Sequence, residues 1–444
     1  MPRNAATALT AAILLAVATA PAGDWPHWRG PNLNGSTDET NLPASFSKTE
    51  NIAWVVRTPG ISGSTPIVLG ERIYMTSPTY INDNLLAMCL STRDGKTLWS
   101  KALGRGKAPP RGEMAASSPV SDGKTVYFTF GSGDLAALDL DGKVLWSRNL
   151  VKEFGCLAIK FGYGASPLLH KGKLYLPLLR RRRPYSYSPG AELPRTGPLK
   201  SYVLCFNARD GKTVWAQPRA SDATDESREN YATPMAIDAG GRTEIIIPGG
   251  EFVTAHDAET GKELWRWEYT KERRIWQRIV VSPVIAGGLI YICQAQCQGL
   301  YALRPGGKGT IPHANYAWKY SGPAPDVCTS LLYRGSLYVL AGDSKIVSCL
   351  DPKTGKSKWR ERIGGAGPYR ASPTGADGKV YCISEGGDVV IFSARDDKYE
   401  ELFRMSLKAR PCRSTIVAAH GSLYLRLSKN LVCVRKMGAA AKAP

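Results

Sequence analysis

The chain has 444 residues, of which 43% are hydrophobic and 22% charged, which excludes a disordered or collagen-like protein. Lys and Arg total 58 against 38 Asp and Glu, and the formal net charge of +20 favours anionic partners without identifying one. At about 100–200 residues per domain, this length predicts two to four domains unless one large all-β array takes up the whole chain.

The amino-terminal segment has the pattern of a secretory signal peptide. Arg3 is followed by the apolar run Ala8–Ala20 and by a small-x-small sequence that ends at Ala22, where we expect cleavage. No later stretch reaches the ~18 consecutive apolar residues of a membrane-spanning helix. We therefore predict that residues 1–22 are a signal peptide and that the chain is exported, periplasmic or extracellular, and not membrane-spanning.

Internal repetition is the strongest signal in the sequence. The segment Ala255–Trp265, AHDAETGKELW, recurs in variants that end at Trp99, Trp146, Trp215, Trp318 and Trp359. Upstream of each copy stand a Ser/Thr-Pro start, an apolar run, a Gly turn and a β-rich run containing Tyr, as in SPVSDGKTVYF from Ser118. The short D-G and T-G turns predict hairpins, because glycine supplies the positive φ that such turns require. Each repeat therefore predicts four strands, A to D.

Eight repeats are expected, which begin at Ser64, Ser118, Ser166, Thr233, Ser282, Ser330, Ser372 and Ser414. Repeats of about 40–50 residues with four strands each are the blades of a β-propeller. The last repeat provides only strands A to C, and we expect Asn51–Val55, with Trp54, to supply its fourth strand. Such an exchange closes the ring and covers the sheet edge that would otherwise be exposed.

The predicted fold class is therefore all-β, a single eight-bladed propeller of four-stranded blades. It spans residues 51–436, follows a leader segment at 23–50, and precedes a flexible tail at 437–444. Trp25 and Trp28 of the leader predict that this segment lies against the ring.

The repeat that ends in tryptophan resembles the docking repeat of the pyrroloquinoline-quinone (PQQ) propeller superfamily. The pattern A-x-D-x-x-T-G-x-x-x-W is matched by Ala255, Asp257, Thr260, Gly261 and Trp265. The leader sequence DWPHWRGPNLNG (Asp24–Gly35) is similar to that of a group of exported PQQ-like propeller proteins. The resemblance implies either a quinone-dependent dehydrogenase or a non-catalytic scaffold of the BamB type, and the fold alone does not choose between them.

The ten cysteines and five histidines suggest no catalytic or metal centre. Cys89, Cys205, Cys349 and Cys433 stand where other repeats have Ala, and we expect buried core residues there. A disulfide between Cys293 and Cys297 would fit one hairpin, but spacing alone does not fix pairing. No Cys/His cluster has zinc spacing, so we predict no metal site and assign no catalytic residue.

The quinone-dependent enzymes of this superfamily stack their cofactor on a ring formed by two adjacent cysteines, and this sequence has no Cys-Cys dipeptide. Their calcium-binding carboxylate and Asn set, and their catalytic Asp, also have no counterpart that we can match. We therefore predict no cofactor and a non-catalytic binding or scaffold role. The alternative is a PQQ-dependent alcohol or sugar dehydrogenase whose activity depends on Glu113 or Arg370.

Most of the excess positive charge falls in the B–C and D–A connections, which share one rim because strand directions alternate. The densest cluster is Arg180, Arg181, Arg182 and Arg183, in a Pro/Gly-rich insertion of the third repeat. Three further arginines precede A strands and are expected to ring the mouth of a central funnel: Arg278, Arg370 and Arg413. We expect Glu113, Glu229 and Asp326 as the opposing carboxylates.

This basic rim predicts a docking face for an acidic protein, an anionic polysaccharide or a lipid headgroup. A solvated basic surface without a specific role is the alternative interpretation. Nucleic acid is not expected as a partner, because the chain is exported and contains no recognised nucleic-acid-binding module. We expect a monomer.

Overall fold

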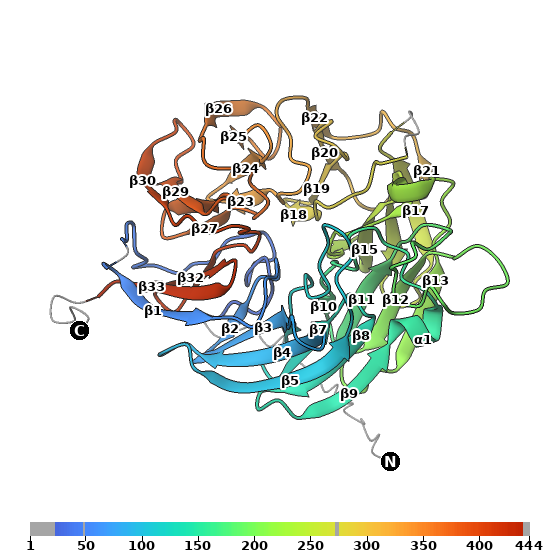
Figure 1. Ribbon diagram of the computed structural model, residues 1–444. Coiled ribbons are helices and arrows are strands. Elements are labelled where there is room, and N and C mark those ends of the chain that lie inside the picture. Colours follow the sequence, from blue (N-terminus) through green and yellow to red (C-terminus); the bar gives the residue numbers. More distant parts are fainter. Residues whose placement is uncertain (1–22, 48, 271–274, 438–444) are drawn as a thin grey trace, which may run out of the picture.

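Eight β-sheets surround a central channel in the computed structural model, which describes residues 23–47, 49–270 and 275–437 (Figure 1). Within each blade, strands A to D pair antiparallel from the axis outwards. The prediction of an eight-bladed propeller is confirmed. The predicted signal peptide and the tail beyond Met437 lie outside the described residues.

Blades 1 to 4 follow one another along the chain. Blade 1 contains β2 (Ile67–Leu69), β3 (Arg72–Pro78), β4 (Asn84–Ser91) and β5 (Thr97–Arg105). Blade 2 contains β6 (Val120–Ser121), β7 (Thr125–Thr129), β8 (Asp134–Asp139) and β9 (Val144–Asn149). Blade 3 contains β10 (Leu168–His170), β11 (Lys173–Leu178), β12 (Tyr202–Asn207) and β13 (Thr213–Pro218). Blade 4 contains β14 (Met235–Ala239), β15 (Arg242–Gly249), β16 (Phe252–Asp257) and β17 (Glu263–Glu268).

Blades 5 to 8 complete the ring. Blade 5 contains β18 (Val284–Ala286), β19 (Leu289–Cys293), β20 (Leu300–Leu303) and β22 (Trp318–Tyr320). Blade 6 contains β23 (Leu331–Tyr333), β24 (Ser336–Ala341), β25 (Ile346–Leu350) and β26 (Ser357–Arg362). Blade 7 contains β27 (Thr374–Ala376), β28 (Lys379–Ile383), β29 (Asp388–Ser393) and β30 (Glu401–Ser406). Blade 8 contains β31 (Val417–Ala419), β32 (Ser422–Leu427), β33 (Asn430–Arg435) and β1 (Ile52–Arg57).

Three short elements lie in the connections. The helix α1 (Leu150–Phe154) follows blade 2, and the 3-10 helix η1 (Asp225–Arg228) follows blade 3. The strand β21 (Gly309–Ile311) leaves blade 5 and pairs in parallel with β17, so that blade 4 gains a fifth strand. Among the described residues, none of the helices has the length and apolar character needed to cross a membrane.

Tryptophan side chains dock each blade on the next. Six indole N–H groups donate to a carbonyl in the C–D turn of the following blade at 2.9–3.2 Å, from Trp54, Trp99, Trp146, Trp215, Trp318 and Trp359. The glycine of such a turn lies against the indole ring. At Gly142, for example, φ is +87° and an added Cβ would stand 2.7 Å from the Trp99 side chain. Glycine is therefore required both for its backbone conformation and for the space that it leaves.

Trp265 differs from the other docking tryptophans. Its Nε1 donates to Glu244 Oε2 of its own blade, at 2.9 Å. The C–D connection of blade 5 contains β21 and does not form the short glycine turn of blades 1 to 4 and 6. A buried carboxylate therefore replaces the turn carbonyl as the indole's acceptor.

A ring of hydroxyl side chains lines the channel, one from each blade just before strand A: Thr65, Ser118, Ser166, Thr233, Ser282, Thr329, Ser372 and Thr415. In six of the eight steps between these residues, the backbone N–H of one donates to the hydroxyl oxygen of the next at 2.9–3.1 Å. In three repeats the hydroxyl residue that faces the channel is the sequence neighbour of the residue predicted to begin the repeat: Thr65, Thr329 and Thr415. Two adjacent hydroxyl residues stand there, and sequence cannot tell which one faces the channel.

The amino-terminal strand closes the ring as predicted, with β1 beside β33 (Figure 1). Trp54 lies opposite Cys433, and its indole N–H donates a hydrogen bond to the Thr92 carbonyl of blade 1. Blade 8 therefore lacks a covalent C–D turn on which blade 7 could dock. Blade 7 has Phe403 at the docking position, and this ring packs on Phe46 of the leader at 5.2 Å.

The leader crosses the end of the channel that carries the A–B turns. Arg29 is buried and donates to the carbonyls of Ser330 and Pro373, at 2.7 and 3.1 Å, which ties the leader to blades 6 and 7. Trp28 lies beside Arg29 and lines the channel. The channel is thus a funnel whose wide mouth opens on the opposite rim.

We expect Trp54→Ala to lower the free energy of unfolding by about 2–4 kcal/mol, because it removes a packed indole and its hydrogen bond at the closure. Denaturant unfolding of the purified protein measures this loss. The matched control is Val55→Ala on the same strand, where the side chain is 55% exposed and a change within about 0.5 kcal/mol is expected. Equal losses for the two variants would contradict the docking role of Trp54.

Candidate functional site

A cavity of about 1150 Å³ opens at the centre of the rim that carries the B–C and D–A connections. It continues into a space of about 150 Å³ inside the hydroxyl ring. Its lining includes four of the six residues that the sequence placed there, Glu113, Arg278, Arg370 and Arg413, but not Glu229 or Asp326. The structure therefore brings together side chains that are up to 300 residues apart in the sequence.

Arg413 joins two carboxylates across the funnel mouth. Its guanidinium contacts Glu113 Oε1 at 3.1 Å and Glu385 Oε1 at 2.7 Å. The other Glu113 oxygen accepts the backbone N–H of Gly63 at 2.6 Å. The connections before blades 1, 2 and 8 are thereby fixed to one another by charge-assisted hydrogen bonds.

The other two mouth arginines are also paired. Arg278 contacts Asp326 at 3.1 Å and Glu226 at 3.4 Å, whereas Arg370 contacts Asp343 at 2.8 Å. Sequence reasoning found Asp326 but missed Glu226, Asp343 and Glu385. Nothing in the repeat pattern marks these carboxylates, because they lie in loops whose paths differ from blade to blade.

Glu229 does not face the mouth arginines, so the prediction that it opposes them is wrong. It is fully buried and accepts hydrogen bonds from the Lys160 backbone N–H, the Tyr231 hydroxyl and the Tyr185 hydroxyl, at 2.8–3.0 Å. Burial raises the pKa of Glu229 to about 7. The three hydrogen bonds favour the charged form and lower the pKa, but their effect is smaller than that of burial. The carboxylate therefore connects the insertion of blade 3 to the neighbouring connections.

The four consecutive arginines of that insertion have different roles. Arg180 is only 1% exposed, and its guanidinium donates to the carbonyls of Phe154, Gly155, Cys156 and Lys200 at 2.6–2.9 Å. The prediction that it belongs to an exposed basic cluster is wrong, because these carbonyls occupy its donors. Arg181 pairs with Asp225 at 2.6 Å and lies over the Tyr185 ring. Arg182 and Arg183 are exposed and have no ion pair within the described part of the chain.

Three further cations line the funnel mouth and were not singled out from the sequence: Lys107, Arg111 and Arg410. All three are exposed, and in the described ranges none of them forms an ion pair. Their connections were predicted as basic, but sequence gave no means of separating paired from unpaired arginines.

Apolar side chains are exposed on the same rim. Tyr80 and Ile81, in the B–C connection of blade 1, are 62% and 77% exposed, and Tyr80 lines the funnel. Trp276, in the D–A connection after blade 4, is 50% exposed. Trp267 is buried and stacks on His313 at 5.3 Å, as a packing role requires.

The cysteines are free thiols and, apart from Cys297, buried. The Cys293–Cys297 disulfide that the hairpin would permit is not formed. Burial raises the pKa of Cys89 and Cys205 to about 12, as expected for inert core thiols. No group of three or more His, Cys, Asp or Glu is placed to hold a metal ion among the residues described.

Eight four-stranded blades around a polar funnel, six of which dock through an indole on the C–D turn of the next blade, define a PQQ-like β-propeller. The chain belongs to the PQQ-like repeat family described as "Outer membrane protein assembly factor BamB", which it matches over residues 26–162, 198–309 and 317–435.

Curated relatives include both enzymes and an assembly factor. The chain is 21% identical over 276 residues to the polyvinylalcohol dehydrogenase of a Pseudomonas species. The aligned region covers 56% of this chain and 41% of that protein. It is 23% identical over 283 residues to the outer membrane protein assembly factor BamB of Bordetella pertussis, which covers 61% of this chain and 60% of that protein. The chain spans about half the length of the curated relatives that it matches.

Solved structures show the same fold. The quinohemoprotein alcohol dehydrogenase from Comamonas testosteroni superimposes with a TM-score of 0.67 at 14% identity, over 96% of this chain and 82% of that one. BamB from Moraxella catarrhalis superimposes with a TM-score of 0.58 at 14% identity, over 85% of this chain and 97% of that one. At these identities the comparison establishes shared architecture and not a shared activity.

The raised pKa of Glu229 predicts a pH-dependent stability. Between pH 4.5 and 7 the folded protein retains a proton that the unfolded chain has lost, so stability falls as pH rises through this range. The free energy of unfolding of the wild type, measured relative to that of Glu229→Gln, is therefore expected to fall by on the order of 3 kcal/mol between pH 4.5 and pH 8. Parallel denaturant unfolding of both proteins measures the difference, and a difference that does not change with pH would contradict the buried acid.

Proposed function

We propose that this chain is an exported, non-catalytic binding module that docks an acidic protein on the rim of its B–C and D–A connections. The observation that carries the proposal is a set of exposed cations that have no ion-pair partner in the described part of the chain, on the same rim as exposed aromatic side chains. We name this surface the docking rim and define it by Lys107, Arg111, Arg183, Arg410, Tyr80, Ile81 and Trp276.

The cations of the docking rim are available to a partner. Arg413 and Arg278, at the funnel mouth, are already paired with carboxylates. Lys107, Arg111 and Arg410 line the same mouth, are exposed and have no ion pair among the described residues. Exposed charges of one sign attract an oppositely charged partner and accelerate its association.

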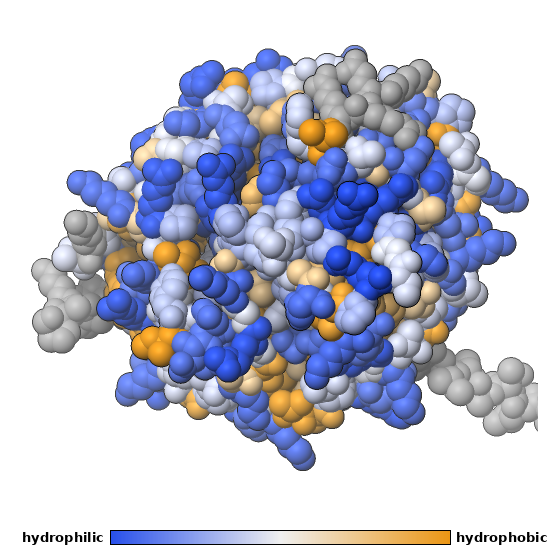
Figure 2. Space-filling model, turned by 45° about the vertical axis from the view of Figure 1, so that its right-hand side comes forward, coloured by the Kyte–Doolittle hydropathy of each residue, from blue (hydrophilic) through white to orange (hydrophobic). Residues whose placement is uncertain are grey.

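The aromatic side chains give the docking rim an apolar component. Tyr, Trp and Arg are the residues that contribute most to binding at protein interfaces. Elsewhere, Val55, Leu98, Leu145, Val214 and Leu402 are exposed singly on the outermost strands of different blades. On the face seen in Figure 2, hydrophilic side chains predominate and the apolar ones form small separate groups. Such a surface favours electrostatic docking with a few apolar anchors.

Two further observations agree with a binding module. The family is described by a protein assembly factor, and curated and structural relatives include BamB. Residues 1–22 have the composition of a secretory signal, which is the basis for proposing export.

A triple variant, Lys107→Gln, Arg111→Gln and Arg410→Gln, tests the docking rim. We expect it to weaken binding to poly-glutamate, a model acidic polypeptide, by at least about tenfold at 50 mM salt, because three unpaired charges are lost. Raising the salt to 300 mM is expected to weaken the wild type in the same direction. Biolayer interferometry measures both effects.

The matched control is Lys124→Gln, Lys143→Gln and Lys356→Gln, which removes three exposed cations from the opposite rim. It is expected to bind like the wild type. Equal weakening by the two triple variants would refute a localised docking rim. Tighter binding to polygalacturonate than to poly-glutamate would replace the acidic protein by an anionic polysaccharide.

The alternative function is that of a PQQ-dependent dehydrogenase. It is favoured by the polyvinylalcohol dehydrogenases among the relatives and by a polar funnel of sufficient volume that contains Arg278, Arg370 and Arg413. It predicts that the protein incubated with PQQ and calcium retains the quinone absorption after gel filtration and turns over alcohols with an artificial dye. Arg370→Gln and Glu113→Gln are expected to reduce both. Absence of retained quinone would remove this alternative.

A further inference from the structure

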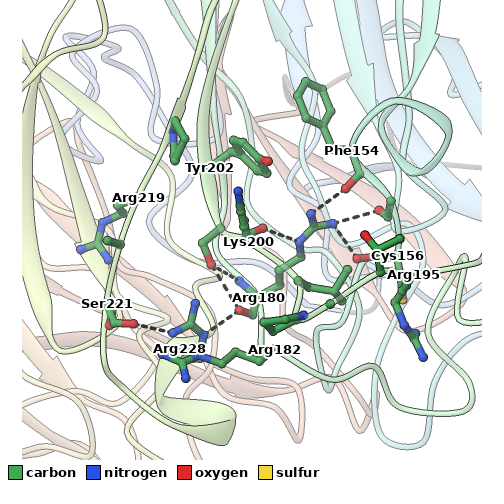
Figure 3. A pocket seen from close by; sticks show the side chains of 18 of the residues that line it. Phe154, Cys156, Arg180, Arg182, Arg195, Lys200, Tyr202, Arg219, Ser221 and Arg228 are labelled. Carbon is green, nitrogen blue, oxygen red and sulfur yellow. Dashed lines mark hydrogen bonds between the residues drawn. The ribbon is translucent and has the colours of Figure 1, made fainter.

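A second cavity, of about 840 Å³, lies away from the funnel, between the insertion of blade 3 and the connection to blade 4 (Figure 3). One wall is formed by residues 193–201 at the end of the insertion, and another by residues 218–221 after β13. Phe154, Gly155 and Cys156 close it beyond α1, and Arg228 of η1 lies on the remaining side. Its volume is in the range of small-molecule binding sites, about 300–1,000 Å³.

The lining of this cavity is strongly basic. It contains six cations and no Asp or Glu among the described residues: Arg180, Arg182, Arg195, Lys200, Arg219 and Arg228. The funnel, by contrast, contains arginines that are paired with carboxylates. Like charges that are gathered without counter-charges repel one another, and a bound anion relieves this repulsion.

The inner cations are buried and held by neutral acceptors. Arg219 is 1% exposed, and it donates from Nε to Thr254 Oγ1 at 3.0 Å and from Nη2 to the Phe252 carbonyl at 3.1 Å. Arg228 donates to the carbonyls of Arg180 and Ser221 at 3.2 and 2.6 Å (Figure 3). These bonds fix the guanidinium groups in place without neutralising their charge.

Their surroundings disfavour the charged form. Burial lowers the pKa of Arg219 to about 10. Burial and then the charge of Arg182 lower the pKa of Arg228. The Asp222 carboxylate acts on Arg228, and the Glu263 carboxylate on Arg219, in the opposite direction. Asp222 does not line the cavity.

The outer cations are exposed at the entrance. Arg182, Arg195 and Lys200 have no ion pair within the ranges that the structure describes. The Arg195 guanidinium makes one long hydrogen bond, to the Ala191 carbonyl at 3.4 Å. Their side chains are therefore free to close on a ligand that enters between them.

The rest of the lining is apolar or neutral. Leu193, Pro194, Pro198 and Leu199 belong to one wall, and Tyr202 is also among the lining residues. Inorganic ions would not use this surface, whereas the body of an organic molecule would cover it. The cavity thus combines a charged region for an oxyanion with an apolar region for the group that carries it.

We propose that this cavity binds a small organic anion, a carboxylate or phosphate attached to a body the size of a sugar ring. Arginine forks bind both oxyanions in the same bidentate geometry, so the carboxylate and the phosphate share one recognition chemistry. The site goes beyond the proposed docking function, because the defining residues of the docking rim do not line it.

Calorimetric titration with glucuronate, glucose 6-phosphate, inorganic phosphate and neutral glucose tests the proposal at low salt. We expect saturable binding of glucuronate or glucose 6-phosphate, weaker binding of inorganic phosphate, and none of glucose. The ligand with the higher affinity, glucuronate or glucose 6-phosphate, shows whether the site prefers a carboxylate or a phosphate. The double variant Arg195→Gln and Lys200→Gln is expected to weaken binding at least about tenfold.

The control is Arg209→Gln with Lys212→Gln, which removes two exposed cations from the C–D turn of the same blade. It is expected to leave the affinity within about twofold of the wild type. All four side chains are exposed, so thermal unfolding of both variants should match the wild type and exclude misfolding. Absence of saturable binding for every anion, binding of glucose equal to that of glucuronate, or equal weakening by both variants would overturn the proposal.

The experiment is independent of the docking test. Poly-glutamate binding depends on Lys107, Arg111 and Arg410, which line the funnel mouth and are unchanged in both cavity variants. Loss of the anion site with retained poly-glutamate binding, or the reverse, therefore identifies which proposal has failed.

Discussion

The indole that docks on the C–D turn of the next blade is the contact on which this ring depends. It combines burial of an aromatic face with one hydrogen bond to a turn carbonyl, and it recurs at six of the eight blade junctions that the structure describes. Each blade buries its faces against two neighbours, so an open ring would leave two sheets uncovered. The strand β1 removes this problem by placing Trp54 at the last junction.

The same closure determines where a function can reside. Because the leader crosses the A–B end of the channel through Arg29 and Trp28, the funnel is accessible from the rim with the long connections. The hydroxyl ring fixes the inner strands and gives the channel a neutral polar lining. Variation among the blades is therefore concentrated in the long connections, which carry both cavities and the docking rim.

Charge is the property in which the two cavities differ most. In the funnel, arginine and carboxylate side chains from different blades neutralise one another, as Arg413 does with Glu113 and Glu385. In the cavity of blade 3, Arg219 and Arg228 are held by carbonyl and hydroxyl oxygens, and no carboxylate lines the cavity beside them among the described residues. Ion pairs thus fix three arginines at the funnel mouth, whereas the described lining of the cavity of blade 3 has arginines and no carboxylate.

The sequence by itself determined the all-β class, the number of blades, the docking residues and the closure by Trp54. These features follow from a pattern of strands, turns and tryptophan that recurs from repeat to repeat. It also placed Glu113, Arg278, Arg370 and Arg413 at one mouth, since the position before strand A is equivalent in every blade. Only the tertiary structure decided that Arg180 is buried, that Glu229 faces tyrosines and that Arg182 and Arg195 share a cavity. These outcomes depend on the paths of insertions that occur once, and an ion pair between loops of different blades has no periodic signal in the sequence.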